Sequence, residues 1–89
     1  MDRDWAFRFL TDKAESWLSS VNENADTSIG EELRQHDAIA IRKMTSEINH
    51  ILGAETPISA EDVLDTAAQN LFGCRYEELR KKYRLGIEN

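Results

Sequence analysis

Few residue types in this 89-residue chain could catalyse a reaction or bind a metal, and their spacing keeps them apart. The chain has one cysteine, Cys74, and two histidines, His36 and His50. A nucleophilic thiol needs a nearby base such as imidazole, but Cys74 follows Gly73 in a predicted turn while both histidines fall in a predicted helix. Along a straight helix the two histidines would lie about 21 Å apart. We therefore expect all three to be packing or surface residues.

The carboxylates and glycines also lack the arrangement of a catalytic or cofactor site. The adjacent pairs Glu31–Glu32 and Glu77–Glu78 lie in predicted helices, where neighbouring side chains point about 100° apart and form no acid–base pair. A single cysteine excludes an intramolecular disulfide and a zinc site that needs two or four cysteines. No phosphate-binding loop is predicted, because the glycines are scattered at Gly30, Gly53, Gly73 and Gly86. We predict no catalytic residue, no metal and no cofactor, and so no enzyme.

Helical periodicity runs through most of the sequence and predicts an all-α fold. Apolar residues at three- and four-residue spacing indicate four helices, at about 4–21, 28–52, 60–72 and 75–84. No alternation with a period of two indicates a strand. We expect residues 1–89 to form a single domain, built as a small helical bundle or an orthogonal array.

The first predicted helix has one broad apolar stripe. At about 100° per residue its members cover one side of the helix, and Trp5 lies outside them. The segment 22–26 is rich in Asn and Asp, which favour turns, so the helix should end there. The stripe consists of Ala6, Phe9, Leu10, Ala14, Trp17, Leu18 and Val21.

The second predicted helix has signals at both ends and one interruption. Ser28 and Glu31 have the spacing of a capping box, and Gly53 favours the left-handed conformation that ends a helix. Asp37 projects into the apolar stripe, either as the N-cap of a separate helix or because the face is hydrated there. We predict one long helix over 28–52, straight or kinked. Its stripe consists of Ile29, Leu33, His36, Ala40, Met44, Ile48 and Ile51.

Two further helices follow the linker that contains Pro57. Ser59 is the expected N-cap of the third helix, Ile58 and Val63 are placed to form a hydrophobic staple, and Gly73 ends the helix. Its buried face is predicted to be Val63, Leu64, Ala67, Ala68, Leu71 and Phe72. The short fourth helix is expected to bury Tyr76, Leu79 and Tyr83.

Charge is distributed unevenly along the chain. Residues 1–66 contain 14 acidic and 6 basic residues, a net charge of −8, whereas residues 67–89 contain 3 acidic and 5 basic residues, a net charge of +2. The acidic N-terminus is unlike a signal peptide, and no apolar run approaches the roughly 20 residues of a membrane span. We expect a cytoplasmic protein that does not enter membranes, with an acidic body that keeps it in solution.

Two large apolar residues fall on predicted polar faces, and they suggest a protein-interaction module. Trp5 lies off the stripe of the first helix, and Ile39 projects away from the stripe of the second. Such residues can form a contact surface for another protein or for a homodimer. Alternatively, neighbouring helices cover them and they belong to the core. The leading hypothesis is a non-enzymatic regulator or adaptor that binds through Trp5 and Ile39.

A second hypothesis is nucleic-acid binding by the basic C-terminal helix 75–84. Arg80, Lys81, Lys82 and Arg84 form a cluster that could contact phosphates. Basic residues in a last helical turn also complement the helix dipole, which gives them a structural explanation.

The stretches Ile58-Ser59-Ala60-Glu61-Asp62-Val63, Thr66-Ala67-Ala68 and Leu79-Arg80-Lys81-Lys82-Tyr83-Arg84 together resemble part of the DNA-binding domain of the bacterial chromosomal replication initiator. The resemblance covers 58–63, 66–68 and 79–84, needs a one-residue insertion, and corresponds to the opening helices of that domain. The helix-turn-helix that reads bases in the family has no counterpart in these 89 residues. The resemblance therefore implies at most a phosphate-facing role for Lys81, Lys82 and Arg84.

A third, minor hypothesis is an acidic inhibitor that mimics nucleic acid. It requires carboxylates spread along one surface, whereas Arg8, Lys13 and Arg34 dilute the acidic charge. The candidate carboxylates are Asp12, Glu15, Glu23, Asp26, Glu31 and Glu32.

Overall fold

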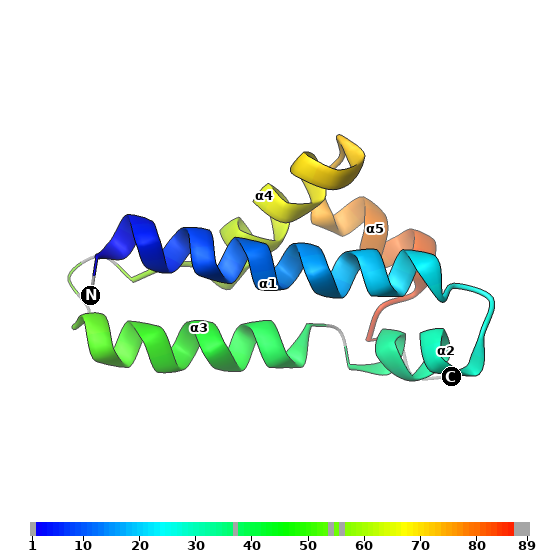
Figure 1. Cartoon of the computed structure of the whole chain (residues 1–89), viewed down its shortest axis with the longest axis horizontal. Coiled ribbons are helices and arrows are strands. Elements are labelled where there is room, and N and C mark those ends of the chain that lie inside the picture. Colours follow the sequence, from blue (N-terminus) through cyan, green and yellow to red (C-terminus); the bar gives the residue numbers. More distant parts are fainter. Residues whose placement is uncertain (1, 37, 54, 56, 87–89) are drawn as a thin grey trace.

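The computed structural model of the chain describes residues 2–36, 38–53, 55 and 57–86, and every regular element in these ranges is an α-helix. The predicted all-α class is confirmed. The long helix α1 has α3 antiparallel beside it, while α4 crosses it at an angle and α5 turns back toward its C-terminal half (Figure 1). The five helices are α1 Arg3–Glu23, α2 Ser28–Gln35, α3 Ile39–Leu52, α4 Ala60–Phe72 and α5 Tyr76–Tyr83.

Helix α1 begins at an N-cap, Asp2, whose carboxylate accepts a hydrogen bond from the backbone N–H of Asp4. Its predicted stripe is the centre of the core, although Phe9 and Trp17 are only partly buried. Thr11 is buried beside the stripe. Its hydroxyl donates a hydrogen bond to the Phe7 carbonyl, 2.8 Å away, so the buried hydroxyl has a partner. The fully enclosed members of the stripe are Ala6, Leu10, Ala14, Leu18 and Val21.

The turn into α2 depends on Thr27 and Gly30. Thr27, and not Ser28 as predicted, is the N-cap: its hydroxyl accepts from the Gly30 N–H at 3.1 Å and donates to the Asn24 carbonyl. The single Thr27 hydroxyl therefore both closes the turn after α1 and caps α2. Gly30 is required because a Cβ there would lie 1.7 Å from the Asn24 carbonyl oxygen.

The predicted single helix over 28–52 is instead two helices, α2 and α3. Helix α2 ends at its C-cap His36, and Ala38, with φ 60° and ψ 26°, has the left-handed conformation immediately before α3. That conformation cannot continue a right-handed helix, so the chain changes direction here. The alternative that Asp37 caps a separate helix falls on a residue outside the described ranges; the N-cap position of α3 belongs to Ala38, which offers no side-chain acceptor.

The break changes which side chains of this segment are buried. In α3 the core positions are Ile41, Thr45 and Ile48, with Met44 partly buried. Four members of the predicted stripe are corrections, because they are exposed: Ile29, His36, Ala40 and Ile51. Because α2 and α3 have different axes, apolar residues that would share one side of a continuous helix face different directions in the two helices.

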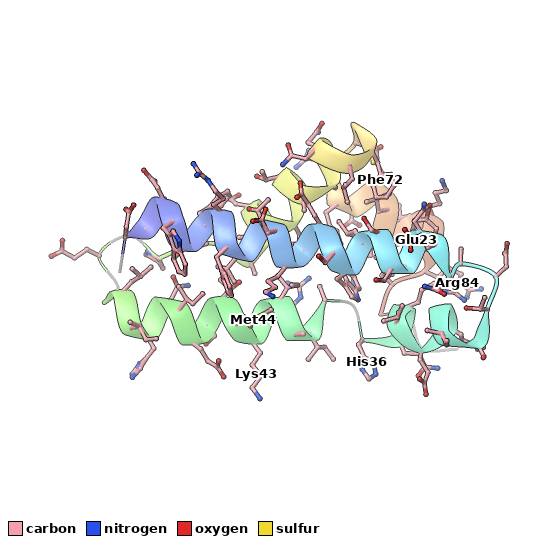
Figure 2. All side chains as sticks on the ribbon, in the orientation of Figure 1. Glu23, His36, Lys43, Met44, Phe72 and Arg84 are labelled. Carbon is pink, nitrogen blue, oxygen red and sulfur yellow. The ribbon has the colours of Figure 1, made fainter. Side chains whose placement is uncertain are left out.

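Helices α4 and α5 largely follow their predictions. Ser59 caps α4, Gly73 ends it in the left-handed conformation, and the predicted staple residues Ile58 and Val63 are both buried. In α5, Tyr76 and Leu79 are buried and Tyr83 is partly so. Two residues predicted to be buried, Leu71 and Phe72, are exposed, because the last turn of α4 rises away from α1 (Figures 1 and 2).

Asn49 fixes the connection between α3 and α4. Its side-chain amide accepts from the Ile58 N–H at 2.7 Å and donates to the Ile58 carbonyl at 2.8 Å. An ion pair between Arg42 and Glu61 joins the same two helices. These contacts hold one flank of α3 against the start of α4.

Because Thr27 is the N-cap of α2, replacing Thr27 should lower the stability of the protein more than replacing its neighbour Ser28. Thr27→Ala should lower the free energy of unfolding by about 1 kcal/mol, because it removes the N-cap acceptor. Ser28→Ala, the matched control, should change it by less than about 0.5 kcal/mol. Urea unfolding followed by circular dichroism measures both values, and a larger effect at Ser28 would contradict the assignment.

The hydrogen bonds of Asn49 predict a large loss of stability when this partly buried polar residue is replaced. Asn49→Ala should destabilise the protein by about 1–3 kcal/mol, since it leaves both backbone groups of the buried Ile58 without their partner. His50→Ala is the control, because His50 is the exposed next residue of the same helix. Equal unfolding midpoints for the two variants would show that the amide contacts do not hold the linker.

Candidate interaction surface

An aromatic pair is exposed near the start of α1. Trp5 is 55% exposed and stacks on Phe9, with ring centroids 5.5 Å apart and planes inclined by 14°. The Lys13 ammonium lies 5.4 Å from the centroid of the Phe9 ring, which places a cation on the same row of side chains. The four-residue spacing of Trp5, Phe9 and Lys13 makes this row continuous along α1.

The row lies on the side of α1 turned away from α4. Phe7 and Thr11 line a groove together with Thr66 of α4, so they mark the α4 side of α1. Trp5 and Phe9 each precede one of these residues by two positions, a rotation of about 200° about the helix axis. Phe9, with Trp5 stacked on it, is therefore on the flank turned away from Phe7 and Thr11, while the groove extends round the helix to Asp12, two turns after Trp5.

Helix α3 has a corresponding apolar flank. Arg42 and Asn49 contact Glu61 and Ile58, so they mark the α4 side of α3. Two positions after each of them come Met44 and Ile51, which by the same rotation of about 200° are on the flank turned away from α4. Met44 is partly buried against the core, and Ile51 is 65% exposed.

These two flanks belong to neighbouring helices and form one surface. Because α1 and α3 are antiparallel, the first turns of α1 and the last turns of α3 lie at the same end of the molecule (Figure 1). We call the surface made by Trp5, Phe9, Met44 and Ile51 the α1–α3 face. It combines two aromatic rings, a flexible thioether and a branched aliphatic side chain. Aromatic residues and methionine are enriched in protein interfaces, and the buried centre of an interface is apolar.

Ile39, the second residue predicted to bind a partner, lies elsewhere. It is 56% exposed, so like Trp5 it is not a core residue. It begins α3 at the end remote from Trp5, and it is about 200° round the helix from the buried Ile41. Lys43, one turn later on that side, points away from α1 (Figure 2). The structure therefore does not bring Trp5 and Ile39 together.

The predicted nucleic-acid-binding residues are distributed around α5. Arg80, Lys81 and Lys82 are consecutive, so they point in three directions about 100° apart and do not form one basic stripe. Glu77 lies 3.8 Å from the Arg80 guanidinium, and Glu78 lies four residues before Lys82, a spacing that stabilises helices.

Arg84 follows α5 as its C-cap in the left-handed conformation (Figure 2). Beyond it the chain returns to the core, because Leu85 is buried and the Gly86 N–H donates to the Arg34 carbonyl at 2.8 Å. The Tyr83 hydroxyl also donates to the Asn22 side chain at 2.6 Å. The end of the basic cluster is thus fixed against α1 and α2.

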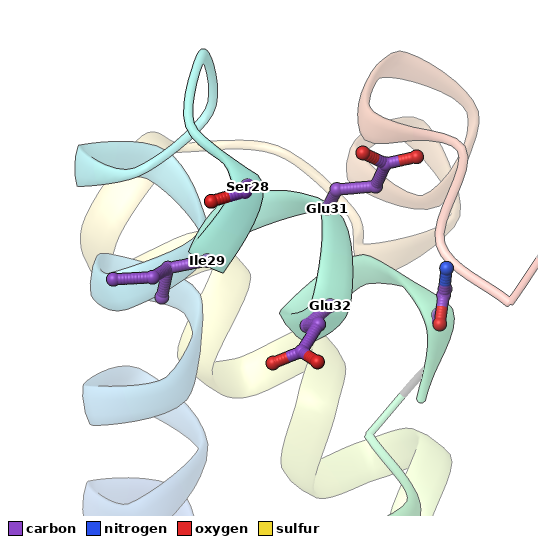
Figure 3. A pocket seen from close by; sticks show the side chains of 5 residues that line it. Ser28, Ile29, Glu31 and Glu32 are labelled. Carbon is purple, nitrogen blue, oxygen red and sulfur yellow. The ribbon is translucent and has the colours of Figure 1, made fainter.

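The carboxylates proposed for nucleic-acid mimicry do not share one surface. Asp12 and Glu15 line the groove between α1 and α4, where Arg3 and Arg8 lie as well. A shallow recess on α2 contains Glu31 and Glu32 with Ile29, and their side chains point in different directions and do not converge on a ligand position (Figure 3). Asp12 and Glu15 thus lie in a groove that also contains basic side chains, whereas Glu31 and Glu32 lie on a different helix beside Ser28, Ile29 and Gln35.

Within the described ranges, no group of three His, Cys, Asp or Glu side chains is placed to hold a metal ion. The described helices also include none with the length and apolar character of a membrane span. Comparisons with protein families, curated protein sequences and solved structures give no match. The resemblance to the replication initiator thus rests on the segments 58–63, 66–68 and 79–84 alone.

The two tryptophans predict stability losses of different size. Trp17 is partly buried and packs against Tyr76, with centroids 6.4 Å apart, so Trp17→Ala should destabilise the protein by about 2–3 kcal/mol. Trp5→Ala removes only an exposed stack and should cost about 1 kcal/mol or less. Urea unfolding of both variants tests this, and comparable losses would place Trp5 in the core.

Proposed function

We propose that this protein is a non-enzymatic regulator or adaptor that acts by binding another protein, or a second copy of itself, through the α1–α3 face. The observation that supports it most is the Trp5–Phe9 stack, which leaves the larger ring more than half exposed. Tryptophan is among the residues most enriched at the centres of interfaces, where it contributes much of the binding energy.

The form of the face also supports a protein partner. The aromatic rings are already held against each other, so little side-chain entropy remains to be lost on binding. Met44 can adapt its shape to a partner, and Ile51 extends the apolar surface onto the second helix. A surface formed by two antiparallel helices that lie side by side suits an apolar helix of the partner, packed along the groove between them.

Nucleic-acid binding by α5 has weaker support. The sequence from Tyr76 to Tyr83 contains two acidic and three basic residues, so its net charge is only +1. The acidic body would oppose a polyanion as well. Binding that falls steeply with salt and is lost in Lys81→Ala with Lys82→Ala would nevertheless favour this function over the one proposed.

The experiment compares isoleucines of similar exposure on different helices. Ile51→Ser and Trp5→Ser should each weaken binding by about tenfold or more, a typical loss for an interface anchor. Ile29→Ser, on α2 and 61% exposed, is the matched control and should leave binding unchanged. Ile39→Ser tests whether the interface reaches the other end of α3.

Light scattering over a concentration series measures self-association, and affinity capture from lysate followed by titration with the captured protein measures a different partner. The two serine variants at Trp5 and Ile51 must keep their helicity by circular dichroism for the comparison to count. Equal binding by the wild-type chain and by both of these variants would overturn the proposed face.

A further inference from the structure

The connection between α2 and α3 holds an alanine in an unfavourable conformation. Ala38 has φ 60°, in the left-handed region that favours glycine, and it is only 2% exposed. Ala38 gives α3 no side-chain cap, whereas Thr27 caps α2 and Ser59 caps α4; the Ile39 N–H donates instead to the His36 carbonyl at 2.8 Å. A backbone held in this way persists only because the packing around it enforces it.

The sequence on both sides of Ala38 is compatible with one uninterrupted helix. Leu33, Ala40, Met44 and Ile51 keep helical spacing across the break. In a continuous helix over 28–52 the left-handed residue would become regular, and the N–H and C=O groups at the two facing helix ends would pair with each other. The bent arrangement therefore forgoes local stability that the straight one would recover.

A single copy cannot straighten without losing its core. Straightening would carry α1 and α2 away from α3, α4 and α5, and α1 contributes the central stripe that packs on α4. A second copy removes this obstacle, because α1 of each copy can pack on α3 and α4 of the other with the same contacts. Short hinges under strain favour such an exchange of elements between copies.

We infer that this chain forms a domain-swapped dimer in which residues 28–52 make one continuous helix and each copy's α1–α2 arm packs on α3–α5 of its partner. The Tyr83–Asn22 hydrogen bond re-forms between copies. The hydrogen bond from the Gly86 N–H to the Arg34 carbonyl re-forms between copies as well, because Arg34 belongs to the α1–α2 arm that packs on the partner.

A pair of alanine-to-glycine variants tests the role of the strained residue. Ala38→Gly removes the strain of the left-handed conformation in the bent form, and it lowers the stability of the straight helix. Both effects favour the monomer, so the dimerisation constant should fall by about tenfold or more. Ala40→Gly is the control, because residue 40 is helical and exposed in the bent form and would stay in a helix in the straight one. Its dimerisation constant should stay within about threefold of the wild-type value.

Cross-linking shows whether the arms are exchanged. Glu15 of α1 and Asn70 of α4 line the same groove, so we would prepare Glu15→Cys and Asn70→Cys as separate variants, each with Cys74→Ser. After the two variants are unfolded together and refolded, a short bismaleimide should join one chain of each kind. In an unswapped dimer these sites stay within their own chains, and no mixed covalent product forms.

Two results would overturn the inference: a monomer at every concentration tested, or a dimer that gives no mixed covalent product although a chain carrying both cysteines cross-links internally. Neither result affects the α1–α3 face, which the proposed function uses. Conversely, Trp5→Ser and Ile51→Ser should leave the mixed cross-link unchanged, so failure of either proposal is recognised separately.

Discussion

The fold depends on how closely α4 can approach the central stripe of α1. Ala6 and Ala14 on α1 and Ala67 and Ala68 on α4 are all fully buried. Because their side chains are small, the two helix backbones can lie near each other, and Leu10 and Leu64 fill the space between. Helix α3 also packs against the α1 stripe, so larger residues in place of these alanines would displace two helices at once.

This arrangement determines where apolar residues must remain exposed. Helix α1 is covered by α4 and α3 on adjoining sides, so an apolar residue on its remaining side is not covered by either of these helices. Trp5 is such a residue, and Ile51 has the same position on α3 relative to α4. The α1–α3 face thus follows from the packing of the described helices, which leaves one side of α1 uncovered.

The sequence was sufficient for features that depend on local chemistry. The cap at Ser59, the glycine stop at Gly73 and the stripe of α1 were all predicted, because a cap or a helical period is visible within a few residues. The left-handed conformation of Ala38 was not, since alanine favours helices and only the surrounding packing imposes it. The exposure of Leu71 and Phe72 was missed for a related reason: periodicity shows an apolar side but not whether another helix reaches it.

In the candidate site, too, the sequence indicates what depends on one helix but not what depends on the packing of several helices. Trp5 could be selected because it departs from the stripe of its own helix, whereas Met44 and Ile51 fit a stripe and were assigned to the core. Only the contacts of Arg42 and Asn49 with the start of α4 show which flank of α3 is turned away. The basic cluster illustrates the opposite error, because proximity in sequence suggested one surface, and the helix spreads the side chains around its circumference. A surface is therefore better sought among apolar residues that fit the helical period but find no neighbour than among charges that are adjacent in the chain.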